Sequence, residues 1–107
     1  MGKEMFDLIN EIAECQAACN YCFNACLEEQ DVQMMTRCIR LDKDCSEICG
    51  LALSLVASDS EFSDDILELC VMACEACATE CERHKFDHCR ECAKACRKCA
   101  DACRTYK

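Results

Sequence analysis

Residues 89–103 read CRECAKACRKCADAC, with cysteine at positions 89, 92, 96, 99 and 103. Steps of three and four residues return to the same face of an α-helix, so all five thiols share one face while the charged residues occupy the others. A bundle helix normally carries leucine on such a face. The stretch therefore predicts a helix whose buried face is lined with sulfur, which we call its cysteine face.

The same pattern recurs upstream. Residues 15–26 read CQAACNYCFNAC and residues 70–81 read CVMACEACATEC, both with cysteines spaced four, three and four apart. Residues 38–49 read CIRLDKDCSEIC. An offset of 55 residues superposes the first two stretches, and an offset of 54 superposes 38–49 on 92–103. The sequence thus predicts a helical hairpin present in two copies.

Composition agrees with an all-α protein. The 107 residues include no proline and only two glycines, and 52% of them are apolar, which favours long helices joined by short connections. We expect residues 1–107 to form a single cysteine-lined domain, an up-down-up-down antiparallel four-helix bundle. The first helix is predicted over Lys3–Glu28 and the second from an N-cap at Asp31. The third follows a cap within residues 58–61, and the fourth follows a connection over residues 82–87.

The predicted topology gives the bundle two different ends. The chain termini and the second connection share one end, which we call the apolar end because hydrocarbon side chains gather there: Met5, Leu8, Ile12, Ala52, Leu55, Val56, Ile66, Leu67 and Tyr106. The other end, which we call the histidine end, gathers soft or borderline metal ligands: Cys26, Cys38, Cys81, Cys89, His84, His88, Met34 and Met35. On the second helix we expect the inward face to contain Met34, Cys38, Leu41, Cys45 and Cys49.

Charge and hydropathy exclude several partners. A formal charge of −9 argues against nucleic acid, because phosphate binding needs a basic surface. No apolar run approaches the roughly 18 residues of a membrane span, and residues 1–14 lack the apolar segment of a signal peptide. We therefore expect a cytoplasmic protein without a membrane partner.

Three explanations compete for the sixteen cysteines. Disulfides are disfavoured because helical neighbours hold their Cβ atoms about 5 to 6 Å apart, whereas a disulfide needs about 3.8 Å. Cysteine as a small buried hydrophobe accounts for one or two per helix, but not for whole faces without leucine. Two sulfurs bridged by one soft ion lie about 4 to 4.6 Å apart, which CxxxC pairs can reach. Metal binding explains the spacing directly.

Charge selects the metal. One Cu(I) per thiolate is neutral, whereas Zn(II) held by four thiolates buries two negative charges per site. Iron–sulfur clusters want cysteines on loops with glycine or proline nearby, which this sequence lacks. We therefore expect several Cu(I) ions per chain, stored or detoxified. The alternative is a structural or redox-sensing cysteine bundle that binds a few Zn(II) ions. No nucleophile with a base, open three-ligand site or phosphate loop is recognisable, so we do not expect an enzyme.

These motifs resemble those of the cytosolic copper storage proteins, which are cysteine-lined four-helix bundles. The resemblance rests on residues 15–26, 38–49 and 70–81, and on the HxxxHC run that begins at His84 and leads into residues 89–103. It implies that core cysteines bind Cu(I), that histidines near the histidine end assist, and that bundles form homotetramers. The outer charges, acidic on the first helix and basic on the last, are compatible with such docking.

The candidate metal ligands are therefore the sixteen cysteines and three residues of the histidine end. They are Cys15, Cys19, Cys22, Cys26, Cys38, Cys45, Cys49, Cys70, Cys74, Cys77, Cys81, Cys89, Cys92, Cys96, Cys99, Cys103, His88, His84 and Met34. His88 precedes Cys89 at a helix start, where the helix dipole favours thiolate. Met34 is expected on the buried face of the second helix, where it could equally serve as core packing.

Overall fold

The computed structural model describes residues 1–106, and these contain four α-helices and one short 3₁₀ helix. The elements in chain order are α1 (Lys3–Leu27), η1 (Val32–Met35), α2 (Thr36–Ala57), α3 (Ser63–Cys81) and α4 (Asp87–Thr105). No strand occurs in this part of the chain. The predicted all-α class is confirmed. Among residues 1–106, no helix combines the length and the apolar character needed to cross a membrane.

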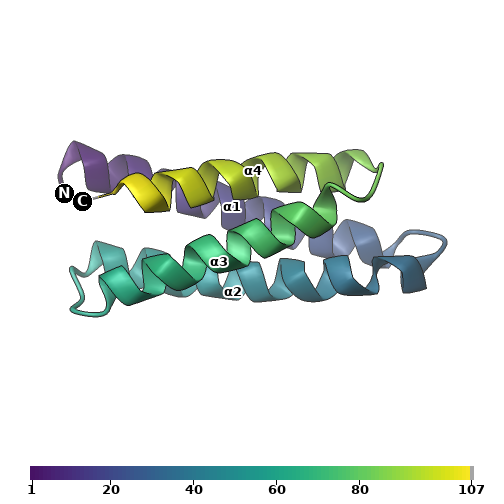
Figure 1. The fold of residues 1–107 in the computed structure, drawn as a ribbon, viewed down its shortest axis with the longest axis horizontal. Helices are drawn as coiled ribbons and strands as arrows, with labels where there is room; N and C mark the ends of the chain where they lie inside the picture. Colours follow the sequence, from purple (N-terminus) through teal and green to yellow (C-terminus); the bar gives the residue numbers. More distant parts are fainter. Residues whose placement is uncertain (107) are drawn as a thin grey trace.

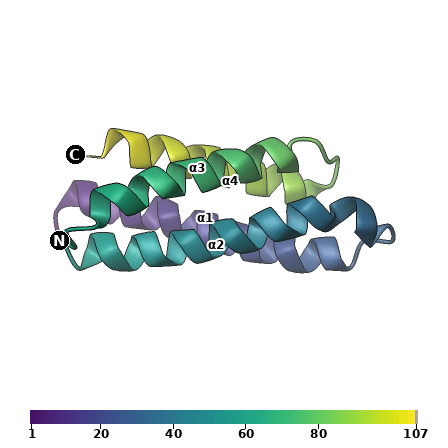
Figure 2. The ribbon, with the colours of Figure 1, turned by 60° about the horizontal axis from the view of Figure 1, so that its bottom comes forward.

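The four helices run antiparallel to their neighbours in a rod of 44 × 19 × 17 Å (Figure 1). α1 packs against α2 and α4, and α3 packs against the same two helices, so the backbone of each helix has two neighbours, while side chains of diagonal helices meet at the axis, as Cys15 and Cys74 do at 3.8 Å. Both termini lie at one end with the α2–α3 connection, and the other two connections lie together at the opposite end (Figures 1 and 2). The up-down-up-down bundle predicted from the short connections is confirmed.

The start of the second helix differs from the prediction. Asp31 makes no side-chain cap, and residues Val32–Met35 form a 3₁₀ turn before α2 begins at Thr36. A 3₁₀ helix has three residues per turn, so the residue one turn before the buried Cys38 is Met35 and not Met34. Met34 is consequently 69% exposed, whereas Met35 is only 2% exposed. The predicted place of Met34 on the buried face is wrong.

A second difference lies within α2, where Cys38, Cys45 and Cys49 are buried as predicted but one position between them is not the expected one. Leu41, expected to face inward, is only half-buried at the edge of the core, and its neighbour Asp42 is fully buried instead. Counted from Met35, the buried positions 35, 38, 42, 45 and 49 follow regular steps of three and four residues. The inward face of α2 therefore includes one acidic side chain among its thiols.

The α2–α3 connection also differs from the expected cap. α3 begins at Ser63 with Phe62 in the N-cap position, and no side chain caps it. Ser60 shapes the turn instead, because its Oγ accepts a hydrogen bond from the Phe62 N–H at 3.0 Å. Asp59 has a φ of 56°, a left-handed conformation that aspartate tolerates better than most residues. The predicted location of the turn is correct, but its capping residue is not.

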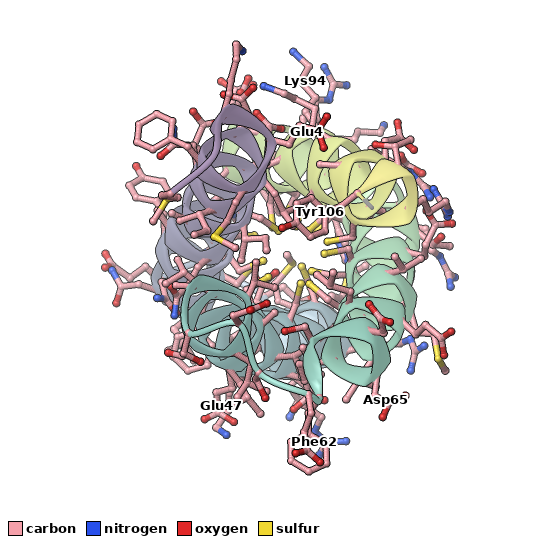
Figure 3. All side chains as sticks on the ribbon, turned by 90° about the vertical axis from the view of Figure 1, so that its left-hand side faces the viewer. Glu4, Glu47, Phe62, Asp65, Lys94 and Tyr106 are labelled. Atoms are coloured by element: carbon pink, nitrogen blue, oxygen red, sulfur yellow. The ribbon has the colours of Figure 1, made fainter. Side chains whose placement is uncertain are left out.

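The core consists of thiols over most of its length and hydrocarbon at one end. All sixteen cysteines are buried, and sulfur atoms gather between the helices when the bundle is viewed from the end that holds the termini (Figure 3). Leu8, Ile12, Val56 and Leu67 are buried at that end. Tyr106 points inward there. Hydrocarbon side chains therefore fill most of the apolar end, where Cys103 is 5% exposed.

Charged residues hold the helices together from outside. Lys98 on α4 lies 3.7 Å from Glu11 and 3.8 Å from Glu14 on α1. Arg97 binds Glu82 at 2.9 Å, and Arg104 binds Glu75 at 2.8 Å across the α3–α4 interface. The acidic first helix and the basic last helix are thus neighbours within one bundle, where Lys98 joins them. Lys98 and Glu14 are both more than half exposed, and docking between bundles through these charges stays a prediction.

Candidate metal centre

Sulfurs of different helices lie as close together as those of one helix. Within α1, the Sγ atoms of Cys22 and Cys26 are 3.7 Å apart. Between helices, Cys38 Sγ lies 3.6 Å from Cys81 Sγ, and Cys15 Sγ lies 3.7 Å from Cys96 Sγ. The sequence pointed first to CxxxC pairs along each helix. The structure shows that contacts across helices are equally short, so the thiols form one continuous column.

The column results from the short side chain of cysteine. Bundle helices pack with their axes about 8 to 10 Å apart, and the 4, 3, 4 spacing keeps every thiol on the axis side of its helix. Leucine would fill this space with methyl groups, whereas the smaller cysteine leaves Sγ as the atom that meets its counterpart. Residue type and spacing together therefore place sulfur, and little else, along the axis.

Groups of four ligand atoms, all within 4.8 Å of one another, recur along this column. Five such groups are Cys15/Cys49/Cys74/Cys99, Cys15/Cys19/Cys45/Cys96, Cys19/Cys77/Cys92/Cys96, Cys22/Cys26/Cys38/Cys89 and Cys22/Asp42/Cys81/Cys92. The first takes one cysteine from each of the four helices. Several residues belong to two groups, so neighbouring sites share ligands. Such sharing is the arrangement that a multinuclear metal–thiolate cluster requires.

The sulfur separations fit metal binding better than disulfides. Three sulfurs that surround one ion at about 2.3 Å lie about 4 Å from one another. The Sγ atoms of Cys45 and Cys49, and those of Cys70 and Cys74, are 4.0 Å apart. A disulfide needs about 2.05 Å, and all sixteen cysteines are free. Small side-chain movements would therefore suffice to coordinate soft ions.

Burial favours the protonated form of thiols at both ends of the column. Removal from water raises the pKa of the Cys26 thiol, and the nearby Cys38 raises it further. At the other end of the column, the contact with Cys70 raises the pKa of Cys103 to about 12. Neutral thiols pack as small apolar groups, so we expect the core to form without metal. Binding a soft ion must release the thiol proton.

Asp42 is the functional residue that sequence reasoning missed. Its Oδ1 accepts hydrogen bonds from Cys77 at 3.2 Å and from Cys92 at 3.4 Å. Cys81 lies 3.8 Å from the same oxygen, and Cys38 lies 3.9 Å from Oδ2. Burial raises the pKa of Asp42 to about 8, with a further contribution from Cys92. One oxygen ligand therefore stands in the middle of a sulfur column.

The internal duplication contained a signal for Asp42. The offset of 54 residues that superposes Cys38 on Cys92 also superposes position 42 on Cys96 and position 35 on Cys89. Asp42 and Met35 thus stand where the fourth helix has cysteines. Hydropathy gives no sign of this position, because aspartate is ordinarily a surface residue. Repeat alignment, rather than hydropathy, identifies it.

His88 joins the thiols at the histidine end. Its Nδ1 lies 3.4 Å from Cys22 Sγ, 3.5 Å from Cys89 Sγ and 3.9 Å from Cys26 Sγ. Its Nε2 lies 2.8 Å from a carboxylate oxygen of Glu29. The first turn of α4 positions the ring over the end of the sulfur column. His88 is therefore placed where an ion that reaches the column would meet a nitrogen and several sulfurs.

The other two predicted ligands of this end are placed differently. His84 is largely buried, but its Nε2 lies 2.8 Å from Glu80, which also contacts Arg37 and Arg83. Met34 is exposed on η1. The structure thus brings His88 to the thiols, holds His84 in an ion-pair network beside them, and leaves Met34 on the surface.

The chain is similar to known proteins in both sequence and structure. The family model of copper storage proteins matches residues 1–107. The Bacillus subtilis uncharacterized cysteine-rich protein YhjQ is 48% identical over 82 residues, which are 77% of this chain and 76% of that protein. A structure of Cu(I)-bound copper storage protein BsCsp3 is 45% identical with a TM-score of 0.93, covering 97% of this chain and 98% of that one.

A further solved structure is that of a cytosolic copper storage protein from Streptomyces lividans with five coppers. It is 37% identical with a TM-score of 0.92, and the match covers 95% of this chain and 90% of that one.

The buried carboxyl of Asp42 should make apoprotein stability fall as pH rises. Its pKa is raised from about 3.9 in the unfolded chain to about 8. The contribution of the Asp42 carboxyl to the free energy of unfolding is therefore fully present below about pH 4 and is lost as pH rises through about 8. Asp42→Asn should remove this dependence. As pH rises, the free energy of unfolding of the variant should therefore increase relative to that of the parent by up to about 1.4 kcal/mol per pH unit. Anaerobic urea unfolding of reduced protein from about pH 5 to 8 measures the difference.

Asp44→Asn is the matched control, because Asp44 is exposed two residues away on the same helix. It should leave the pH dependence of the parent unchanged. Parallel stability curves for Asp42→Asn and the parent would contradict the assignment of a raised pKa to Asp42.

Proposed function

Because this chain belongs to the copper storage protein family, we propose that its sulfur column stores many Cu(I) ions. The observation that carries the proposal is the set of thiol groups that draw on several helices and share members. A protein that held one structural ion would need one such group. A column of overlapping groups instead provides capacity, and thiolate is the ligand that soft Cu(I) prefers.

Charge balance supports Cu(I) over Zn(II). Each thiol that loses its proton and gains one Cu(I) remains neutral as a pair, so the column can fill without accumulating buried charge. A Zn(II) ion with four thiolates leaves two negative charges in the core, and neighbouring sites would repel each other. The overlapping groups of this structure would place such charges side by side. Storage of Cu(I) therefore fits the geometry, and the Zn(II) alternative does not.

We propose as Cu(I) ligands the sixteen cysteines together with His88. His84 and Met34 are proposed to meet ions only as they pass the histidine end, since one is paired with Glu80 and the other is exposed. Ions are proposed to pass through the histidine end because hydrocarbon at the apolar end offers a cation no replacement ligands. Leu8, Ile12 and Val56 are nearly inaccessible there.

The remaining assignments follow from the same chemistry. We infer that residues 1–107 act as one domain, since the four helices share a single core. We propose storage rather than catalysis, because the sites have no open position for a substrate. Sixteen free thiols suit a reducing compartment, and the Streptomyces lividans relative is a cytosolic protein, which supports a cytoplasmic location.

We also propose that the bundles associate as homotetramers, as the resemblance implied. Support comes from apolar side chains on the outer surface, including Tyr21, Leu51 and Met72, each more than half exposed. Apolar area of this kind is available for burial between bundles. The paired charges of α1 and α4 contribute little to this proposal.

Anaerobic titration with Cu(I) against a competing chelator tests the storage function. We expect close to one ion per thiol, because charges cancel at that ratio, and metal analysis of the loaded protein should agree. Cys45→Ser with Cys49→Ser should lower the capacity, since both thiols belong to shared groups. Saturation after only a few ions would support the structural Zn(II) alternative.

Loading kinetics test the proposed route. Replacing His84, His88 and Met34 with alanine should slow uptake and release while leaving capacity nearly unchanged, because the inner thiols remain. The Cys45→Ser, Cys49→Ser variant should do the reverse. Stopped-flow loading of the triple variant at the rate of the parent would refute the histidine end as the entrance.

Sedimentation equilibrium at micromolar concentration tests association. We expect a species of four times the 12.1 kDa chain mass. Leu51→Lys and Met72→Lys should shift the equilibrium toward smaller species if these side chains are covered. A single 12.1 kDa species of the parent protein would rule out the tetramer.

A further inference from the structure

The ring of His88 is constrained on three sides. Glu29 contacts Nε2 at 2.8 Å, and Phe86 stacks on the ring with centroids 5.5 Å apart and planes 4° from parallel. Nδ1 faces the thiols of Cys22 and Cys89. The stack on Phe86 holds the plane of the ring, and a half-turn of the ring within that plane would lose the contacts of both nitrogens. The position of its two nitrogens is therefore set by its neighbours.

The contact with Glu29 determines which nitrogen carries the proton. A neutral imidazole has one N–H donor and one acceptor nitrogen, and an ionised carboxylate only accepts hydrogen bonds. With Glu29 against Nε2, the proton belongs on Nε2, and the lone pair of Nδ1 points toward the sulfurs. Histidines that ligate metals are commonly held in this way by a carboxylate behind the ring.

We propose that Glu29 is a positioning residue that holds His88 as the Nε2–H tautomer and keeps Nδ1 available to an incoming Cu(I) ion. This inference rests on the proposed storage function. Glu29 touches no ion in this role. It acts through His88, by fixing the ring and by making the ligand nitrogen more electron-rich.

The backbone places Glu29 well for this task. Its N–H donates to the carbonyl of Cys26 at 3.2 Å, so the residue closes the last turn of α1. The same turn carries Cys26, one of the four thiols grouped at the histidine end. The Glu29–His88 contact therefore ties the end of α1 to the start of α4, across 59 residues of sequence. Its side chain is 25% exposed, which shields the bond from most of the solvent.

His84 provides an internal comparison. Glu80 contacts its Nε2 at the same 2.8 Å, but Glu80 also lies 3.4 Å from Arg37 and 3.8 Å from Arg83. Of the two histidines within residues 1–106, His88 is the one that contacts thiols. A carboxylate–histidine pair thus occurs twice, and the pair of Glu29 and His88 is the one that faces the sulfur column.

Nitrogen-15 NMR of the metal-free, reduced protein tests the positioning directly. At about pH 8.5, where an ordinary histidine is neutral, His88 of the parent should show a protonated Nε2 and an unprotonated Nδ1. Glu29→Ala should give a mixture of tautomers, and Glu29→Gln, which keeps an acceptor oxygen, should retain the single form. Glu80→Ala should leave His88 unchanged. A single Nε2–H form of His88 in Glu29→Ala would overturn the proposal.

Loading kinetics supply the second readout. Glu29→Ala should slow the first phase of Cu(I) uptake about 10-fold, the lower limit of what losing such a partner usually costs. Capacity and circular dichroism should stay those of the parent. Glu28→Ala, which removes the same charge from the neighbouring exposed position, is the matched control and should load at the parental rate.

A double-variant cycle separates positioning from other effects of the charge. In a His88→Ala background, Glu29→Ala should have no further effect on loading. Equal slowing in both backgrounds would overturn the proposal. The NMR measurement uses no copper, so a protein that holds the single tautomer but takes up few ions would refute the storage function and leave the positioning intact.

Discussion

The structure depends on one constraint: its core must be stable both as neutral thiols and as metal-bound thiolates. Cysteine satisfies it because the protonated side chain packs as a small apolar group and the ionised one is a strong ligand for soft ions. The short side chain also fixes the sulfur separations at 3.6 to 4.0 Å for contacts such as Cys38–Cys81 and Cys45–Cys49. Helices, connections and surface ion pairs serve mainly to hold these sulfurs at that spacing.

Three places along the column carry side chains other than cysteine. Asp42 replaces a thiol with an oxygen that binds Cu(I) weakly, and its raised pKa lets it stay neutral among thiols at low pH. At the histidine end, His88 adds a nitrogen backed by Glu29. At the apolar end, Ile12 and Leu67 replace ligands with hydrocarbon. The column is therefore graded in ligand type, although its spacing is nearly uniform.

Much of this could be predicted from the sequence because the decisive signal is periodic. Steps of three and four residues placed all sixteen cysteines in the core, and the absence of proline favoured four long helices. The errors arose where geometry departs from an ideal helix or where partners are distant in sequence. The 3₁₀ turn before α2 buries Met35 in place of Met34. Within α2, steps of three and four residues from Cys38 both suit a helix, and the apolar Leu41 was the wrong choice over Asp42. The contact of His88 with Glu29 joins residues that no local pattern relates.

The hydrocarbon-filled apolar end has a consequence for the order of exchange. On the proposed route through the histidine end, the column would fill and empty through the same few ligands, and the last ion to arrive would be the first to leave. Ions near Cys49 and Cys103 would be the longest resident, and those near Cys26 and Cys89 would exchange first. On that route, the number of ions that exchange quickly would be set by the cross-section of the histidine end, however long the helices behind it become.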